Sequence, residues 1–397
     1  MTFVARFLGR RLQYTYEIVE RVPGERLVMR TAQGPFPMET TYTWTALSSA
    51  STRMTLRNRV GCAIRDTGEM GGRVRLIELT AALSLATDAG TGQPFEHALR
   101  TCILAVRAAD AMGLAPTEKS TVIYTTLLRF VGCTSDASET AKLAGGDEIA
   151  FNAAMAPVVM ADDRQALPHL LRHLGEDLPL PRRLGRIAAA LSDPHGKARS
   201  LSAHCEVGAR LATRIGLPAD VVDGVAHAYE RWDGKGLPAG LAGDDVPLAT
   251  RIAVVARDVD VIHTRSGIHE VRRVLEDRWG HAYDPAVAAA FLDVGETWLD
   301  EVDRLDPWDA VLDAEPEPAI AVDEARLDDV LAAVADFADL KSPWFIGHSR
   351  AVAELAETAA SVCGLDAGNV SLTRRAALVH DLGIVVSLPG CGIGRVR

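Results

Sequence analysis

Two stretches of this chain carry matching residues at matching spacing, and this repeat limits the fold more than any other feature. The matching positions are, in order, His97, Gly113-Leu114 and Arg129 in the first stretch and His348, Gly364-Leu365 and His380 in the second. In both stretches the Gly follows the first His by 16 positions, and the last residue follows it by 32. Agreement at both spacings predicts an internal duplication.

Helical periodicity dominates both stretches and the chain between them. Apolar residues recur every three or four positions, for example at Leu76, Leu79 and Leu83, and then at Leu99 and Ile103. This spacing places them on one face of a helix. We therefore expect a mainly α-helical chain, with a helical domain over residues 75–300 and a second helical segment over 324–397.

Residues 10–59 have the period of strands instead. Apolar Leu12, Tyr14, Tyr16 and Ile18 alternate with polar residues, which is typical of a half-buried strand. Further short strands are expected up to residue 59, joined by turn residues such as Pro23-Gly24. The pattern predicts an antiparallel meander over residues 1–60.

Two segments separate the expected domains. Residues 61–74 are rich in glycine and have no pattern, which indicates a linker. Residues 301–323 belong to an acidic stretch, 301–330, that holds eleven acids and two Arg. This second segment is interpreted as a linker, or as a solvated helix followed by a linker. The pattern also changes abruptly after Gly383, as it would where a reading frame or gene boundary changes.

Composition excludes several classes of protein. The 397 residues are 48% hydrophobic and contain no run of 18 apolar residues, so the chain can bury a core of two or three domains and we expect no membrane span. The net charge of −11 is concentrated in the acidic stretch and argues against a nucleic-acid partner. Six scattered Cys, with no CxxC pair, predict reduced thiols in the cytoplasm.

A block at residues 225–238 interrupts the helical pattern with turn residues. It contains His227, Glu230 and Trp232-Asp233-Gly234-Lys235-Gly236, and it is followed by Arg251-Ile252. This block resembles the signature of the HD-GYP family, a branch of the metal-dependent HD phosphohydrolases. The resemblance covers roughly residues 75–300 and implies a helical-bundle fold. It also implies metal-dependent hydrolysis of a phosphodiester or cyclic nucleotide, usually cyclic di-GMP.

The second copy resembles the defining HD motif of that family. The motif is formed by His348 together with His380-Asp381 and Gly383. The resemblance implies that His348, His380 and Asp381 bind a divalent metal of the Fe, Mn or Mg class and that Asp381 is catalytic. Imidazole and carboxylate ligands suit such ions, which activate water and bind phosphoryl oxygens. The family's further ligands would lie beyond residue 397.

The first copy has lost most of the family's ligands. Arg129 and Phe130 occupy the positions of the HD pair, and a permanently cationic Arg repels a metal. The family's His pair is replaced by Ala228 and Tyr229, and its Ala-Asp pair by Ala256-Arg257. Three candidate metal ligands remain in this copy: His97, His204 and His227. They are either structural, hydrogen-bonded residues or the remnant of a mononuclear site that includes Asp260.

The N-terminal strands resemble part of the SRPBCC (START-like, polyketide-cyclase-like) superfamily. The similarity rests on short sequence segments such as Tyr14-Thr15-Tyr16-Glu17 and Pro35-Phe36-Pro37. The resemblance implies a fragment of a helix-grip fold, in which a curved sheet surrounds an apolar ligand. It covers about 60 residues, and the long closing helix of that fold is missing.

Three functions remain open on the sequence alone. The first is a metal-dependent phosphodiesterase whose second-copy residues act alone or with ligands from the first copy or another chain. The second is a non-catalytic helical sensor that retains the HD fold. The third is START-like binding of a hydrophobic ligand. A homodimer formed through helices is compatible with each of them.

Overall fold

The computed structural model describes residues 2–7, 10–22, 25–33, 38–48, 51–60, 74–94, 96–158, 163–176, 178–193 and 195–386. The Pro23-Gly24 turn, most of the expected 61–74 linker and the segment after residue 386 lie outside the described residues. The chain divides into two compact units, residues 1–72 and 73–397, which are considered separately.

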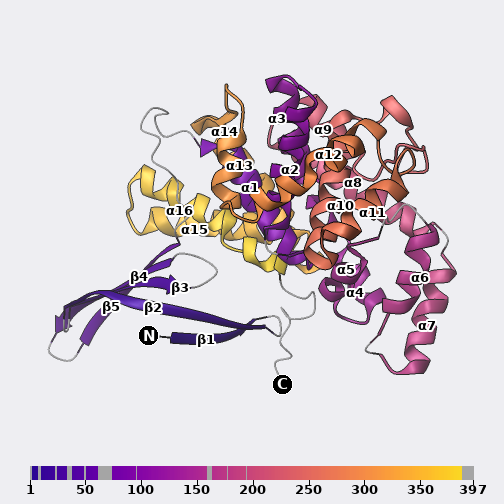
Figure 1. Ribbon diagram of the computed structural model, residues 1–397. Coiled ribbons are helices and arrows are strands. Elements are labelled where there is room, and N and C mark those ends of the chain that lie inside the picture. Colours follow the sequence, from indigo (N-terminus) through magenta and orange to yellow (C-terminus); the bar gives the residue numbers. More distant parts are fainter. Residues whose placement is uncertain are drawn as a thin grey trace. The chain divides into compact units, whose positions relative to one another are not determined.

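The N-terminal unit is an antiparallel five-stranded sheet in the order β1-β2-β3-β4-β5 (Figure 1). Its strands are β1 (Thr2–Phe7), β2 (Arg10–Val22), β3 (Arg26–Gln33), β4 (Met38–Ser48) and β5 (Ser51–Val60). The predicted antiparallel meander is confirmed, although β1 was not expected. The resemblance of this unit to the SRPBCC superfamily stays a prediction.

The second unit is helical, as the sequence predicts (Figure 1). Its first half contains β6 (Val74–Arg75), α1 (Leu76–Gly90), α2 (His97–Ala111), α3 (Pro116–Leu128), η1 (Val131–Thr134), α4 (Ala137–Ala144), α5 (Glu148–Met155), α6 (Asp163–His173), α7 (Leu180–Leu191) and α8 (Gly196–Arg214). It continues through α9 (Ala219–Ala226), η2 (Gly243–Asp245), α10 (Leu248–Ser266), α11 (Ile268–Arg278), α12 (Pro285–Val302), α13 (Pro307–Ala314) and β7 (Ala321–Val322). The second copy supplies α14 (Glu324–Asp339), η3 (Pro343–Phe345), α15 (His348–Val362), α16 (Ala367–Val379) and η4 (Leu382–Val386).

The repeated stretches have the same local architecture. Helices α2 and α15 are both 15 residues long and both begin at the first repeated His. Helices α3 and α16 are both 13 residues long and end immediately before Arg129 and His380, respectively. A left-handed residue precedes α2 and α15, with φ of 65° at Glu96 and 80° at Gly347. This correspondence supports the predicted duplication.

A carboxylate from the preceding helix anchors each first helix in the same way. Asp88 of α1 accepts a hydrogen bond from the backbone N–H of Ala98 at 2.7 Å. Asp339 of α14 accepts one from the backbone N–H of Ser349 at 3.1 Å. The first N–H groups of a helix have no partner within the helix, so each carboxylate satisfies one of them. The repeated His therefore starts from an equivalent, anchored helix end in both copies.

One hydrophobic core joins the two copies. Its buried residues come from α1, α2, α3, α8 to α13 and α14, and include Ile252 at its centre and Phe337 from the second copy. Val385 of η4 is also fully buried and lies against Gly90. The segment from residue 324 onward therefore packs into the same core as the first copy.

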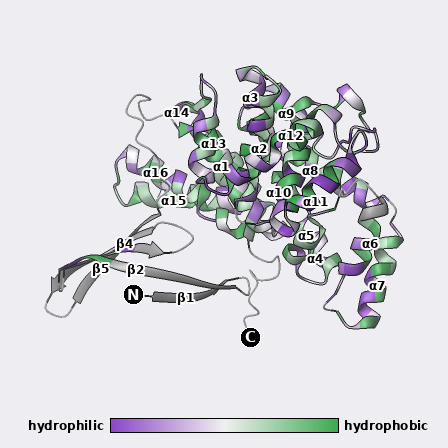
Figure 2. Ribbon diagram, viewed as in Figure 1, coloured by the Kyte–Doolittle hydropathy of each residue, from purple (hydrophilic) through white to green (hydrophobic). Residues whose placement is uncertain are grey.

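Outside this core, both hydrophobic and hydrophilic residues occur along the peripheral helices α6 and α7 (Figure 2).

The acidic segment is not an extended linker. It forms α13 and β7, and Val311 of α13 is fully buried in the core. Strand β7 pairs antiparallel with β6, and Arg75 of β6 donates two hydrogen bonds to Glu315, at 2.7 and 3.1 Å. The apolar face of α13 explains the difference from the expectation, because the high density of acids conceals a short amphipathic helix.

Gly132 of η1 permits a close approach to the backbone of α8. A side chain at this position would overlap the backbone carbonyl of His204 on α8. We predict that Gly132→Ala lowers the free energy of unfolding by about 1–3 kcal/mol, because the backbone must shift to admit the methyl group. Gly185→Ala is the matched control. Nothing lies within 4 Å of its added carbon, so the free energy should stay unchanged or rise slightly in urea unfolding. Equal effects of the two variants would contradict the prediction.

Candidate metal centre

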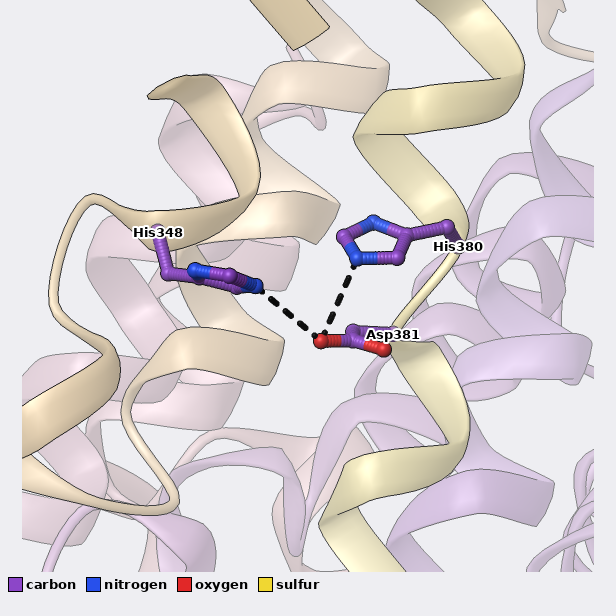
Figure 3. A group of neighbouring side chains, drawn as sticks. All are labelled: His348, His380 and Asp381. Atoms are coloured by element: carbon purple, nitrogen blue, oxygen red, sulfur yellow. Dashed lines mark ion pairs between the residues drawn. The ribbon is translucent and has the colours of Figure 1, made fainter. Parts of the chain in front are cut away.

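Three side chains of the second copy converge at the junction of α15 and α16. His348 is the first residue of α15, and His380 and Asp381 follow the last residue of α16 (Figure 3). Oδ2 of Asp381 lies 3.4 Å from Nε2 of His348 and 3.2 Å from Nε2 of His380. One donor atom from each residue lies within 4.8 Å of the other two. Within the described part of the chain, this is the one cluster of His, Cys, Asp or Glu with the spacing for a metal.

The donor set fits a divalent metal. Two ligands that each bind an ion at about 2.0–2.2 Å lie roughly 3 to 3.5 Å from one another, as Oδ2 of Asp381 does from Nε2 of each His. Nδ1 of His380 is 2.7 Å from the backbone carbonyl oxygen of Ala377, so it donates its proton there and leaves the lone pair of Nε2 free. The three side chains are 32–39% exposed, so coordination positions stay open to water and substrate.

The equivalent position of the first copy has no ligand pair. Arg129 and Phe130 follow α3 as His380 and Asp381 follow α16. The guanidinium carbon of Arg129 lies 5.3 Å from the centroid of the Phe130 ring and 5.7 Å from that of Tyr229. A cation thus stands at the position of the His380 imidazole, and a ring without a lone pair stands at that of the Asp381 carboxylate, so this position would repel a metal.

His97 is fully buried and bound to a carboxylate. Its Nδ1 lies 2.6 Å from Oδ2 of Asp260, and Arg100 donates to the other oxygen of Asp260 at 2.8 Å. Burial lowers the pKa of His97 despite the opposing effect of Asp260. Burial also opposes ionisation of Asp260, but its bonds to His97 and Arg100 bring its pKa below the usual range. A neutral His97 that donates to an ionised Asp260 accounts for both shifts.

His204 forms a separate pair. Its Nε2 lies 2.9 Å from Oδ1 of Asp136, and Nδ1 is 3.4 Å from the hydroxyl of Tyr229. Burial alone would lower the pKa of His204, but the Cys133 sulfur and the Asp136 carboxylate raise it to about 10. Burial alone would raise the pKa of Asp136, but the bond to His204 lowers it. The pair is therefore an ion pair at neutral pH.

His227 lies apart from both, at the C-terminal end of α9. Its Nδ1 is 2.9 Å from the backbone oxygen of Asp223 and 3.1 Å from that residue's carboxylate. The structure does not bring His97, His204 and His227 together. Each has a partner of its own, which argues against a site shared by the three, while Nε2 of His97 is buried with no hydrogen-bond partner among the described residues.

The turn block at residues 225–238 is held by its own acids. Both carboxylate oxygens of Glu230 accept backbone N–H bonds from residues 239–241, at 2.6 to 3.0 Å. Arg231 binds Asp233 through two hydrogen bonds of 2.9 and 2.7 Å. Leu237-Pro238 is a cis peptide bond. These contacts shape the loop without leaving its carboxylates available to a metal.

Sequence reasoning missed the partner of His204. Asp136 lies in a short connection between η1 and α4, and its position gave no sign of a contact with α8. Ser200, four residues before His204 on the same helix, also binds Asp136. The spacing of Ser200 and His204 was the available signal, because residues four apart share a helix face.

Comparison with known proteins identifies the fold. Residues 159–287 match the family model described as an HD domain. This segment is thus similar to an HD domain. The chain is 27% identical to the 3'3'-cGAMP-specific phosphodiesterase 3 of Vibrio cholerae over 312 residues. The aligned region covers 78% of this chain and 68% of the relative. A crystal structure of a cyclic GMP-AMP-specific phosphodiesterase from V. cholerae superposes with a TM-score of 0.61 and 26% identity, covering 79% of this chain and 71% of the other.

More distant relatives share shorter regions. A cyclic di-GMP phosphodiesterase of Thermotoga maritima is 32% identical over 100 residues, which are 22% of this chain and 26% of that protein. The predicted resemblance to HD and HD-GYP phosphohydrolases is therefore confirmed over these regions, and phosphohydrolases with HD domains are metal-dependent. No described helix is long and apolar enough to cross a membrane. The cytoplasmic location stays a prediction.

The His204–Asp136 pair makes a testable contribution to stability. Folding raises the pKa of His204 above its value of about 6.5 in the unfolded chain. Its contribution to the free energy of unfolding is therefore complete below pH 6.5 and is lost as the pH rises through about 10. Asp136 has a lowered pKa, so its contribution is lost only in acid. We predict that His204→Gln lowers the free energy of unfolding by on the order of 2 kcal/mol at pH 6 and by clearly less at pH 10. Urea unfolding of both proteins at the two pH values measures this, and a cost independent of pH would contradict it.

Proposed function

We propose that this protein is a metal-dependent phosphodiesterase whose active site is formed by the second copy. The observation that carries the proposal is the convergence of His348, His380 and Asp381, which the first copy does not reproduce. The homology supports a cyclic dinucleotide as substrate, because the relatives are named as phosphodiesterases of cyclic GMP-AMP and cyclic di-GMP. The alternatives of a sensor alone and of START-like binding gain no support from these relatives.

The residues of the site have distinct roles in this proposal. His348 and His380 supply neutral nitrogen donors, and Asp381 supplies the negative charge that favours a divalent cation. The backbone carbonyl of Ala377 holds the His380 ring in the orientation that directs Nε2 towards the other donors. A bound ion of the Fe, Mn or Mg class supplies Lewis-acid activation of water and of the phosphoryl group.

The first copy serves the second as a scaffold in this proposal. Its core continues into α14, and Gly90 of α1 lies directly against Val385, a few residues after Asp381. The buried ion pair of Lys341 with Glu148, 2.8 Å apart, also joins the connection after α14 to α5. The segments that precede His348 and follow Asp381 are thus braced by the first copy. A homodimer through helices stays a prediction.

Substitution of the proposed ligands should abolish both metal binding and hydrolysis. We predict that His380→Ala and Asp381→Asn bind less than about 0.2 metal per chain and hydrolyse 3'3'-cGAMP at least about 100-fold more slowly than the unaltered protein. Metal is measured by mass spectrometry after loading with Mn²⁺ or Fe²⁺. Hydrolysis is followed by chromatography of the nucleotide products.

His173→Ala is the matched control, because His173 lies on α6 and pairs with the exposed Glu176. Its metal content and rate should equal those of the unaltered protein. Full hydrolysis by His380→Ala and Asp381→Asn would reject the site. Absence of hydrolysis by the metal-loaded unaltered protein, with both 3'3'-cGAMP and cyclic di-GMP, would reject the function.

A further inference from the structure

The first copy contains a cavity of about 550 Å³ beside its replaced HD positions. Arg129, Phe130, His204, Tyr229 and Arg257 line one part of it. The remaining wall is largely apolar and is formed by side chains from α5 and α6 and the residues that follow them, including Phe151, Met155, Leu167, Leu170 and Leu174. Cavities of this size commonly accept small molecules.

Among the residues that the structure describes, Arg129 has no acidic side chain as an ion-pair partner at the edge of this cavity. Its Nε and Nη1 are buried, and neither finds a hydrogen-bond partner among the residues that the structure describes. The rings of Phe130 and Tyr229 offset only part of the free-energy cost of burying the Arg129 guanidinium, since a cation–π contact is weaker than an ion pair. Burial and the nearby charge of Arg257 lower the pKa of Arg129.

The neighbouring acids are already engaged. Asp258 accepts hydrogen bonds from Arg257 at 2.8 Å, from Arg278 at 2.6 Å and from the Tyr283 hydroxyl at 2.7 Å. Asp136 is paired with His204, and Glu230 with backbone N–H groups. Arg257 contributes a second cation, 5.3 Å from the Phe130 ring, and its own Nε is buried with no partner among the described residues. This end of the cavity therefore carries positive charge that its acids do not balance.

We propose that the cavity binds an amphipathic anion, a carboxylate or phosphate group on an alkyl body, without a metal. The anionic group pairs with Arg129 and accepts the hydrogen bonds that its Nε and Nη1 otherwise lack. The alkyl body lies along the leucine-rich wall and removes apolar surface from water. Burying a charge is costly unless it is paired, so both parts of the ligand contribute to affinity.

This second site is independent of the proposed phosphodiesterase centre. Its residues belong to the first copy, and none of His348, His380 or Asp381 lines it. Binding should therefore persist in EDTA and in the His380→Ala variant. A failure of hydrolysis would leave this proposal standing, and a failure of binding would leave the catalytic proposal standing.

Calorimetric titration of the full chain with decanoate and decyl phosphate tests the site. We expect both to bind at least ten times more tightly than decanol, which lacks the charge, and inorganic phosphate, which lacks the alkyl body. Arg129→Met should lower the affinity for decanoate at least tenfold. Arg210→Met is the control, because Arg210 is exposed on α8 and pairs with Glu206, and it should bind decanoate normally.

Several results would overturn the proposal. Decanol binding as tightly as decanoate would show a merely apolar cavity, and unchanged binding by Arg129→Met would remove the assigned residue. If adenosine monophosphate binds more tightly than decanoate, the proposal that the ligand has an alkyl body is wrong. If Arg129→Met does not fold, the comparison of decanoate with decanol on the unaltered protein still decides the question. No binding by either anion rejects the site.

Discussion

The buried carboxylate of Asp260 holds the centre of the helical unit. It is almost inaccessible to water and joins α10 to α2 through His97 and Arg100. A buried carboxylate is tolerated only when its oxygens are satisfied, and these two side chains satisfy both oxygens. The contact fixes the orientation of His97 by engaging its Nδ1 with a carboxylate that Arg100 also binds. In the second copy, Nε2 of His348 instead lies 3.4 Å from Asp381.

The two copies show how one local architecture can carry different chemistry. Both present a histidine at the start of an anchored helix and a variable pair at the end of the next. In the second copy that pair adds a nitrogen and a carboxylate oxygen, and the site attracts a cation. In the first copy it adds a guanidinium and an aromatic ring beside a cavity, so the electrostatic preference of the site is reversed. The charge at two positions suffices for this change, because the surrounding helices are conserved in length and order.

Much of this organisation could be predicted from the sequence. Hydrophobic periodicity predicted the helices, and the resemblance to the HD motif implied that His348 lies near His380 and Asp381. The meander followed from the alternation at Leu12 to Ile18. Local patterns could not predict contacts between distant segments. The burial of α13 depends on a core from other helices, and the pairing of His204 with Asp136 depends on how α8 meets η1. The unpaired state of Arg129 is a property of all its neighbours at once.

The pairing of β6 with β7 places two points of the chain, 240 residues apart at Arg75 and Glu315, side by side. The strand that precedes α1 thus meets the strand that precedes α14, so the first copy starts and finishes at one edge of its own fold. A segment whose ends adjoin can be inserted, removed or permuted without threading the chain through a core. A duplicated gene segment joined at this point would add its helices alongside the existing ones. The geometry is thus compatible with the predicted duplication, because a second copy could be joined here without rearranging the first.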